Sequence, residues 1–406
     1  MVKTPLAWKN LVHNKVRTAV ALAGVGFAVI LMFMQLGFLG AVRKTATQIY
    51  DELEFDLMLR SPTYFHLTDP RTFPRERIYQ AASLPEVEDA KAFYLGLTEW
   101  QAPQPENTKP KDYKGEWRGI ICMGTDPANP AFRPAEIREK VRQLTDSRFL
   151  LIDRKTKDDF GPRDGVQFGP QDIGVKTVLG KERFKIVETF ELGTGLAANG
   201  ACITNPDGFA KACYWQPLQQ VNFGLVSVAE GANLASVQAE LQQLLGPIQE
   251  NGPPTAIPAD VEVLTRDEVK LREEKRWVEE MPLGQIFKLG VWVALFVGVA
   301  IVYQVLSTDI ANMMGEYATL KAMGYTNGYL TSVVLHQSVL LALIGYIPSI
   351  FISWGLYHLV TYYSGMPMAM SLGIASIVLG LAVVMCVVSG LAALRKLFQA
   401  DPADLF

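Results

Sequence analysis

Residues 18–42 read TAVALAGVGFAVILMFMQLGFLGAV and contain no charged side chain. A helix needs ~20 apolar residues to cross the hydrocarbon core of a bilayer, whereas the apolar part of a signal peptide has only roughly 7–15. No small-residue cleavage site follows this segment. We therefore expect a retained transmembrane helix at 18–42, and this expectation decides the fold class.

Two further uncharged runs cover residues 289–308 and 322–394. The second run is too long for one crossing and fits two, separated by TYYSGMPMAM at 361–370, which contains turn residues and interfacial tyrosines. The sequence therefore predicts an α-helical membrane protein with four transmembrane helices, at 18–42, 289–308, 330–360 and 371–394, and a short outer loop at 361–370.

Basic residues near the ends of these segments predict their orientation. They precede the first segment and follow the last, and the connector 361–370 has none; they are Lys3, Lys9, Lys15, Arg17, Arg395 and Lys396. Because cytoplasmic flanks carry the excess of Lys and Arg, both termini are expected in the cytoplasm. The cytoplasmic parts are then an amphipathic interfacial helix at 1–17, a short helix at 309–329 and a tail at 395–406.

The 246 residues at 43–288 are then expected outside the cytoplasm, as a large α+β domain inserted between helices 1 and 2. Strand–helix–strand patterns occur at about 44–105 and again at about 218–264, and they predict one α/β subdomain built from both flanks. Four strand-like runs predict a β-rich insert at about 106–217. Charged or helical flanks predict stalk helices at 43–59 and 265–288.

Motifs for catalysis, metal binding or nucleotide binding are missing from the sequence. The net charge of −3 offers no basic surface for nucleic acid, and the four histidines form no ligand-spaced pair. GPQDIGVKT at 169–177 departs from a phosphate-binding loop because Val175 displaces the lysine by one residue. Cys202 and Cys213 either close a short disulfide loop or are two separately buried thiols, and the sequence leaves both open.

The segment EYATLKAMGY at 316–325 lies between two of the most apolar regions of the chain. It is too short to span a bilayer, too polar to lie inside one and too apolar for a solvated linker. Its apolar side chains recur at helical spacing, which suits a groove on a partner protein. Spacing alone equally allows a helical turn on the lipid headgroups, anchored by Tyr325 and Tyr329.

Several stretches resemble a known family of membrane proteins. IVYQVLSTDI, EYATLKAMGYTNGYL and the terminal RKLFQADPADLF, with PLAWKNL and LMFMQLGF near the start, resemble the FtsX/MacB-type (type VII) permeases of ABC transporters. More narrowly, they resemble the DevC-like permeases of cyanobacteria. The resemblance covers all four apolar segments well and the outer domain more loosely.

This resemblance implies a homodimer in the inner membrane that is not itself an enzyme and binds no cofactor. A separate ABC ATPase would bind ATP and Mg²⁺, since no Walker motif is present in this chain. A periplasmic HlyD-like membrane-fusion protein and a TolC-like outer-membrane channel would complete a tripartite exporter of a glycolipid or another amphiphile. The residues implied at the ATPase surface are Glu316, Tyr317, Leu320, Lys321, Met323, Gly324, Asp401 and Pro402.

A second class of function agrees with the same four helices. An FtsX-like signalling scaffold would activate a periplasmic cell-wall hydrolase without transport, although its outer domain would usually be smaller. The two hypotheses differ in which periplasmic protein binds the outer domain.

Overall fold

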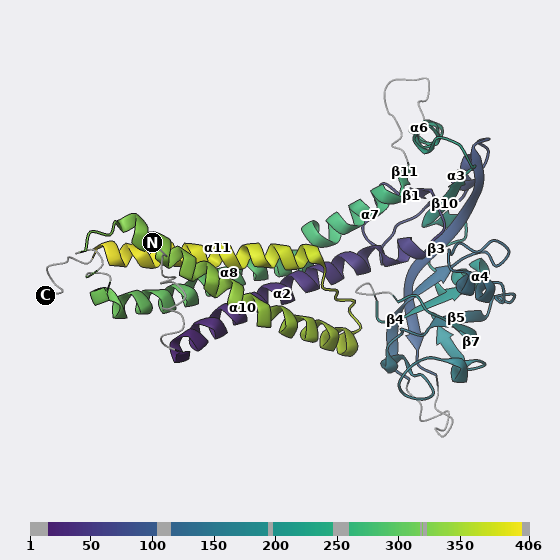
Figure 1. The fold of residues 1–406 in the computed structure, drawn as a ribbon. Helices are drawn as coiled ribbons and strands as arrows, with labels where there is room; N and C mark the ends of the chain where they lie inside the picture. Colours follow the sequence, from purple (N-terminus) through teal and green to yellow (C-terminus); the bar gives the residue numbers. More distant parts are fainter. Residues whose placement is uncertain are drawn as a thin grey trace. The chain divides into compact units, whose positions relative to one another are not determined.

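A computed structural model describes residues 15–103, 115–193, 198–246, 260–316, 319 and 323–399, excluding the side chains of Lys15, Arg17 and 395–399. The chain divides into two compact units (Figure 1). One consists of Met1–Arg43 with Trp277–Phe406, and the other is Lys44–Arg276. Most of the interfacial helix expected at 1–17 lies outside the described residues.

The described residues contain four helices long and apolar enough to cross a membrane. They are α2 (Lys15–Glu52), α8 (Pro282–Asn312), α10 (Asn327–Ser364) and α11 (Leu372–Gln399). The prediction of four apolar helices is therefore confirmed, but each helix extends beyond its predicted segment. The outer loop expected at 361–370, for example, begins only after α10 ends at Ser364.

Small and hydroxylated residues hold these helices together. Ser389 Oγ on α11 donates to Val299 O on α8 at 2.9 Å, and the Tyr357 hydroxyl on α10 donates to Phe33 O on α2. Both serine and tyrosine are buried, whereas Phe351 of α10 is exposed. Hydroxyls that bond between helices and apolar side chains that point outward are what a bundle in lipid requires.

The unit Lys44–Arg276 is called the outer unit below, because the sequence predicts that it lies outside the cytoplasm. It is built on one nine-stranded sheet, with strand order β11-β1-β10-β3-β4-β8-β5-β7-β6. The strands are β1 (Leu57–Arg60), β3 (Val87–Gln101), β4 (Trp117–Gly124), β5 (Phe149–Asp153), β6 (Lys176–Leu179), β7 (Glu182–Phe190), β8 (Ala201–Thr204), β10 (Phe223–Val228) and β11 (Glu262–Thr265). A separate two-stranded sheet joins β2 (Phe73–Pro74) to β9 (Gln220–Val221).

The long strand β3 joins the two parts that the sequence suggested as an α/β subdomain and a β-rich insert. On one side of β3 lie β10, β1 and β11, which come from the flanks, and on the other side lie the strands of the insert. The two parts therefore share one sheet. Two pairings, β4–β8 and β5–β7, are parallel, and parallel neighbours need crossover connections.

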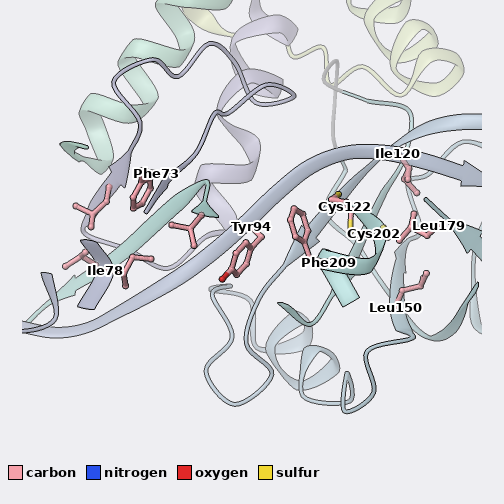
Figure 2. Close-up of a cluster of buried hydrophobic side chains, with 14 of the residues drawn as sticks. Phe73, Ile78, Tyr94, Ile120, Cys122, Leu150, Leu179, Cys202 and Phe209 are labelled. Atoms are coloured by element: carbon pink, nitrogen blue, oxygen red, sulfur yellow. The ribbon is translucent and has the colours of Figure 1, made fainter. Parts of the chain in front are cut away.

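Two hydrophobic clusters cover opposite faces of this sheet. Tyr94 and Trp100 of β3 belong to one cluster, and Phe93 and Leu95 belong to the other, because successive side chains of a strand alternate. The helices around the sheet are α3 (Glu76–Ala81), α4 (Ala135–Val141), α5 (Pro206–Ala212), α6 (Leu234–Leu244) and α7 (Arg266–Lys275). Figure 2 shows Phe209 of α5 packed over Tyr94 and Cys122 of the sheet.

Both predicted stalk helices need correction. The helix expected at 43–59 ends at Glu52, since residues 57–60 form β1 between β10 and β11 with all four side chains buried. Residues 57–60 therefore pair with a strand on each side instead of continuing the helix. The helix expected at 265–288 is α7, then a π-helical turn at Arg276–Glu280, and then α8, which begins at Pro282. Proline suits this first position because its missing N–H has no partner there anyway.

A capping box starts α7 and gives a first testable prediction. Thr265 Oγ1 accepts a hydrogen bond from Glu268 N, and Glu268 Oε2 accepts one from Thr265 N at 2.8 Å. The backbone bond from Thr265 lowers the pKa of Glu268. Thr265→Ala is expected to cost about 1 kcal/mol of unfolding free energy at pH 7. Thermal unfolding of the detergent-solubilised chain measures this loss.

The pH dependence of unfolding provides a control for this capping assignment. A depressed carboxyl pKa stabilises the fold above the unfolded value of about 4.3, and that stability is lost as the pH falls through the folded value. Thr265→Ser keeps the hydroxyl, so its unfolding at pH 7 and pH 3 should follow the parent chain. If Thr265→Ala and Thr265→Ser unfold alike at both pH values, the capping assignment is wrong.

Candidate functional site

The described residues between α8 and α10 lie within the region predicted at 309–329 and begin with a helical stretch. After α8 ends at Asn312, residues 314–316 are helical, Thr319 Oγ1 donates to Gly315 O at 2.8 Å, and Met323 N donates to Thr319 O at 3.0 Å. Asn327 already belongs to α10, so the connecting segment is shorter than predicted.

The described end of this segment is exposed and closed by a turn. Gly324 has φ +89°, a left-handed conformation that glycine adopts without strain, and 63% of the Met323 side chain is exposed. Thr326 then caps α10 by accepting from Tyr329 N, and the rings of Tyr325 and Tyr329 lie 4.8 Å apart. The segment therefore presents an accessible apolar side chain next to a defined turn.

Part of the predicted ATPase surface lies outside the described residues. The described members, Glu316, Met323 and Gly324, are all exposed. The others, Tyr317, Leu320, Lys321, Asp401 and Pro402, lie outside the described residues, and their role stays a prediction. The structure adds one polar contact that the sequence did not indicate. Gln337 on α10 is 3% exposed and donates to Asp309 Oδ2 on α8 at 3.3 Å, which ties the two helices that flank the segment.

In the outer unit, Arg266 joins the end of α2 to the start of α7. Its guanidinium donates to Tyr50 O at 2.9 Å, to Leu53 O at 2.7 Å and to Phe55 O at 2.8 Å. It also lies 4.2 Å from the centre of the Phe55 ring. The last carbonyls of a helix have no partner within it, so Arg266 satisfies carbonyls that α2 leaves unpaired. Burial lowers the pKa of Arg266 from its ordinary value.

A buried polar chain continues this connection between the two helices. The hydroxyls of Tyr50 and Tyr64 lie 2.9 Å apart, and Tyr64 donates to Glu273 Oε2 of α7 at 2.9 Å. Glu273 is 1% exposed, and the guanidinium of Arg60 lies 4.4 Å from the centre of the Tyr64 ring. Burial raises the pKa of Tyr64, so it remains a neutral donor. We call these residues, with Arg266, the helix junction.

A groove of about 390 Å³ opens beside β3 in the same unit. It is lined by residues 68–72, by 95–97 of β3, by 215–217, and by Gln220 and Asn222. Trp215 is 53% exposed in its wall, and Arg71 has a φ of +56°, which is uncommon for a residue with a side chain. The groove combines an aromatic wall with strand backbone.

The part of β3 that lines this groove has backbone N–H and C=O groups available for hydrogen bonds. Leu95 N donates to the side chain of Asn222 at 2.8 Å, and Glu99 O accepts from Gly180 N at 2.7 Å. Alternate residues of a strand direct their N–H and C=O groups to the same side, so Leu97 faces this side too. Among the residues that the structure describes, we find no hydrogen-bond partner for the Leu97 N–H or C=O on that side.

The structure distinguishes between the two arrangements considered for Cys202 and Cys213. All four cysteines are free and buried, so the loop considered between Cys202 and Cys213 is not closed by a disulfide here. Both thiols lie near Cys122: Cys202 is paired with it in the β4–β8 ladder, and Cys213 Sγ lies over Gly96, which is paired with Cys122 on its other side. No group of three or more His, Cys, Asp or Glu in the described part of the chain is arranged to hold a metal ion.

Sequence reasoning missed the helix junction and the groove. The pattern Thr-x-x-Glu at 265–268 predicts a helix start, which places Arg266 in the first turn. Its partners, however, are backbone carbonyls more than 200 positions away. No local pattern reveals those contacts.

The four helices, each long and apolar enough to cross a bilayer, are those of a multi-span membrane protein. Residues 289–402 match the family model described as FtsX-like permease C-terminal. The predicted resemblance to FtsX-type permeases is therefore confirmed for this region. A comparison with curated proteins found no match.

Solved structures similar to this chain come from bacterial membrane proteins. The periplasmic region of MacB from Actinobacillus actinomycetemcomitans is 9% identical, covers 57% of this chain and 98% of its own, and has a TM-score of 0.34. The extracellular domain of the noncanonic ABC-type transporter YknZ from Gram-positive bacteria is 11% identical (52% and 99% covered, TM-score 0.32). A domain of a putative permease protein from Porphyromonas gingivalis is 13% identical (52% and 86% covered, TM-score 0.27).

Proposed function

We propose that this chain is the permease subunit of an ABC-type exporter of the FtsX/MacB class. The match of residues 289–402 to the FtsX-like permease C-terminal domain carries this proposal. In the proposed assembly a homodimer lies in the inner membrane with its termini in the cytoplasm. A separate ATPase binds ATP and Mg²⁺ and contacts the segment between α8 and α10, whose described residues from Gly315 onward are exposed.

The proposed transport mechanism is mechanotransmission, in which ATP-driven movement of the membrane helices moves the outer domain. The helix junction supports it, because Arg266 bonds the start of α7 to the end of α2, and Glu273 near the end of α7 accepts a hydrogen bond from Tyr64, which follows β1. Buried, charge-assisted hydrogen bonds of this kind resist separation more strongly than neutral surface contacts. A displacement of either helix end would therefore be passed to the sheet.

The proposed partners outside the cytoplasm are an HlyD-like membrane-fusion protein and a TolC-like channel, with a glycolipid or another amphiphile as cargo, as in DevC-like systems. We assign the groove to an extended segment of the fusion protein. An extended peptide would supply the backbone N–H and C=O that Leu97 lacks, by the addition of a strand to an open edge. Trp215 would cover its side chains.

Trp215→Ala is expected to weaken binding of the fusion protein about tenfold or more, since buried interface tryptophans are frequent hot spots. Binding of the purified fusion protein to the detergent-solubilised chain measures this loss. Trp117→Ala is the matched control, because Trp117 is 50% exposed but does not line the groove. Equal affinities for Trp215→Ala and the parent chain would place the docking surface elsewhere.

Co-purification tests the function as a whole. The tagged chain is extracted gently from membranes of its native host, and the proteins bound to it are identified by mass spectrometry. Recovery of an ABC ATPase with a membrane-fusion protein is the expected result. An ATPase with a cell-wall hydrolase or its activator would favour the signalling scaffold instead. Recovery of intact chain without any ATPase would overturn the permease proposal.

A further inference from the structure

Three thiols meet in the core of the outer unit. Cys122 of β4 and Cys202 of β8 are directly paired in neighbouring parallel strands, and Figure 2 shows their side chains together beside Phe209. Cys213 follows the last residue of α5 and completes the group. All three are 0% exposed.

The position of Cys213 is defined by a glycine. Gly96 of β3 is paired with Cys122, and a Cβ placed on Gly96 would lie 3.0 Å from Cys213 Sγ. The space above Gly96 is therefore filled by this sulfur, next to Cys122. Cys122 lies 3.7 Å from Thr204 Oγ1, and it is paired on one side with Gly96 and on the other with Cys202. Cys122 is thus the central sulfur of the three.

We propose that Cys122 and Cys213 form a disulfide in the mature protein and that Cys202 remains a thiol. Cys122 and Cys202 are both held in the β4–β8 ladder, so neither backbone is free to adjust to the narrow geometry of a disulfide. Cys213 lies outside helix and sheet, with φ −108° and ψ 62°. Its backbone donates to Phe209 O and accepts from Gln216 N, both nearby in the chain, so it can shift toward Cys122 without breaking a strand ladder. The pairing differs from the Cys202–Cys213 loop, which is one of the two arrangements that the sequence leaves open.

This inference rests on the proposed placement of the outer unit outside the cytoplasm, where disulfides persist. The oxidant is a disulfide-bearing oxidase of that compartment. A thiolate of one cysteine attacks the oxidant's disulfide and forms a mixed disulfide, which the second cysteine resolves. The two cysteines lose two protons and two electrons, and the oxidant leaves as a dithiol. Because all three sulfurs are covered in the folded unit, this exchange precedes closure of the core.

The disulfide would fix one wall of the groove. Cys213 directly precedes Tyr214 and the wall residues 215–217, and Gly96 beneath its sulfur also lines the groove. A covalent link to β4 would hold this wall against the sheet, whereas reduction would release it. The thiol group therefore makes the shape of the groove dependent on the redox state of the chain.

Mass spectrometry of the full-length protein tests the pairing. The chain is isolated from its host with N-ethylmaleimide present, denatured without reductant, alkylated again and digested. We expect a Cys122–Cys213 peptide pair and alkylation of Cys202 and Cys386 only. C202S should keep the pair, and C122S should carry three alkylated cysteines. A Cys202–Cys213 pair, a Cys122–Cys202 pair or four alkylated thiols would overturn the proposal.

Two further measurements separate this inference from its premise. V166C places a reporter thiol at an outer-unit position that is 73% exposed, and a membrane-impermeant maleimide applied to intact spheroplasts should label it. If V166C is labelled and all four native thiols are free, the disulfide is refuted but the placement of the outer unit is not. If V166C is not labelled, both the placement and the disulfide are refuted. Hydrogen exchange of residues 214–220 should accelerate about tenfold after reduction with dithiothreitol. Unchanged exchange would refute the link to the groove.

Discussion

Replacement of Leu320 or Met323 by aspartate is expected to abolish transport while leaving the chain folded and its ATPase partner active. Met323 is 63% exposed, and the two residues are three positions apart in a segment whose described hydrogen bonds are helical. Residues spaced by three lie on one face of a helix, where they would enter a groove of the ATPase. An unpaired carboxylate buried in such a groove costs at least several kcal/mol, so the expected loss of affinity exceeds tenfold.

The measurement compares ATP hydrolysis with substrate export for the assembled transporter in proteoliposomes. An uncoupled variant retains the basal hydrolysis of the ATPase but shows neither export nor stimulation of hydrolysis by the permease. Val166→Asp is the matched control, because it places the same charge on a similarly exposed aliphatic position of the outer unit. Normal export by both Leu320→Asp and Met323→Asp would show that this segment does not couple the two subunits. The headgroup-anchored alternative would then be favoured.

The parts of this fold that can be predicted from the sequence are those set by local composition. Uncharged runs predict α2, α8, α10 and α11, because no other structure buries so many consecutive apolar residues in lipid. Alternating or apolar runs likewise indicate β3, β7 and β10, which the structure contains at those positions.

The parts that cannot be predicted depend on contacts between distant residues. The end of α2 is set by the pairing of β1 with β10 and β11, whose residues lie more than 160 positions away. The partnership of Cys122 with Cys202 exists only because β4 and β8 are neighbours in this register. Strand order and register place side chains from different segments together, and a single sequence contains no direct record of either.

Arg266→Ala is expected to lower the unfolding free energy of the outer unit by about 2–4 kcal/mol. Truncation removes hydrogen bonds to the carbonyls of Tyr50, Leu53 and Phe55 and leaves them without their donor. Each buried polar group left unpaired costs about 1–3 kcal/mol, partly relieved by entering water. The contact between the guanidinium and the Phe55 ring is lost as well. Thermal and urea unfolding of the detergent-solubilised chain measure the loss.

Two further variants separate the geometry of this junction from its charge. Arg266→Lys keeps a positive charge but presents a single ammonium group instead of a planar fork, so it should recover less than half of the stability. Arg138→Ala is the matched control, since Arg138 also donates to backbone carbonyls, those of Phe132 and Arg133, but only within its own neighbourhood. Its loss should be below about 1 kcal/mol, as for other surface changes.

The same variants test whether the junction transmits motion. If the ends of α2 and α7 move the sheet together, Arg266→Ala should reduce export per ATP hydrolysed even at temperatures where the variant is fully folded. Arg138→Ala should leave that ratio unchanged. A folded Arg266→Ala variant with normal export per ATP would mean that the guanidinium only stabilises the outer unit. Transmission would then depend on the buried hydrogen bonds among Tyr50, Tyr64 and Glu273, which Glu273→Gln would test in the same assay.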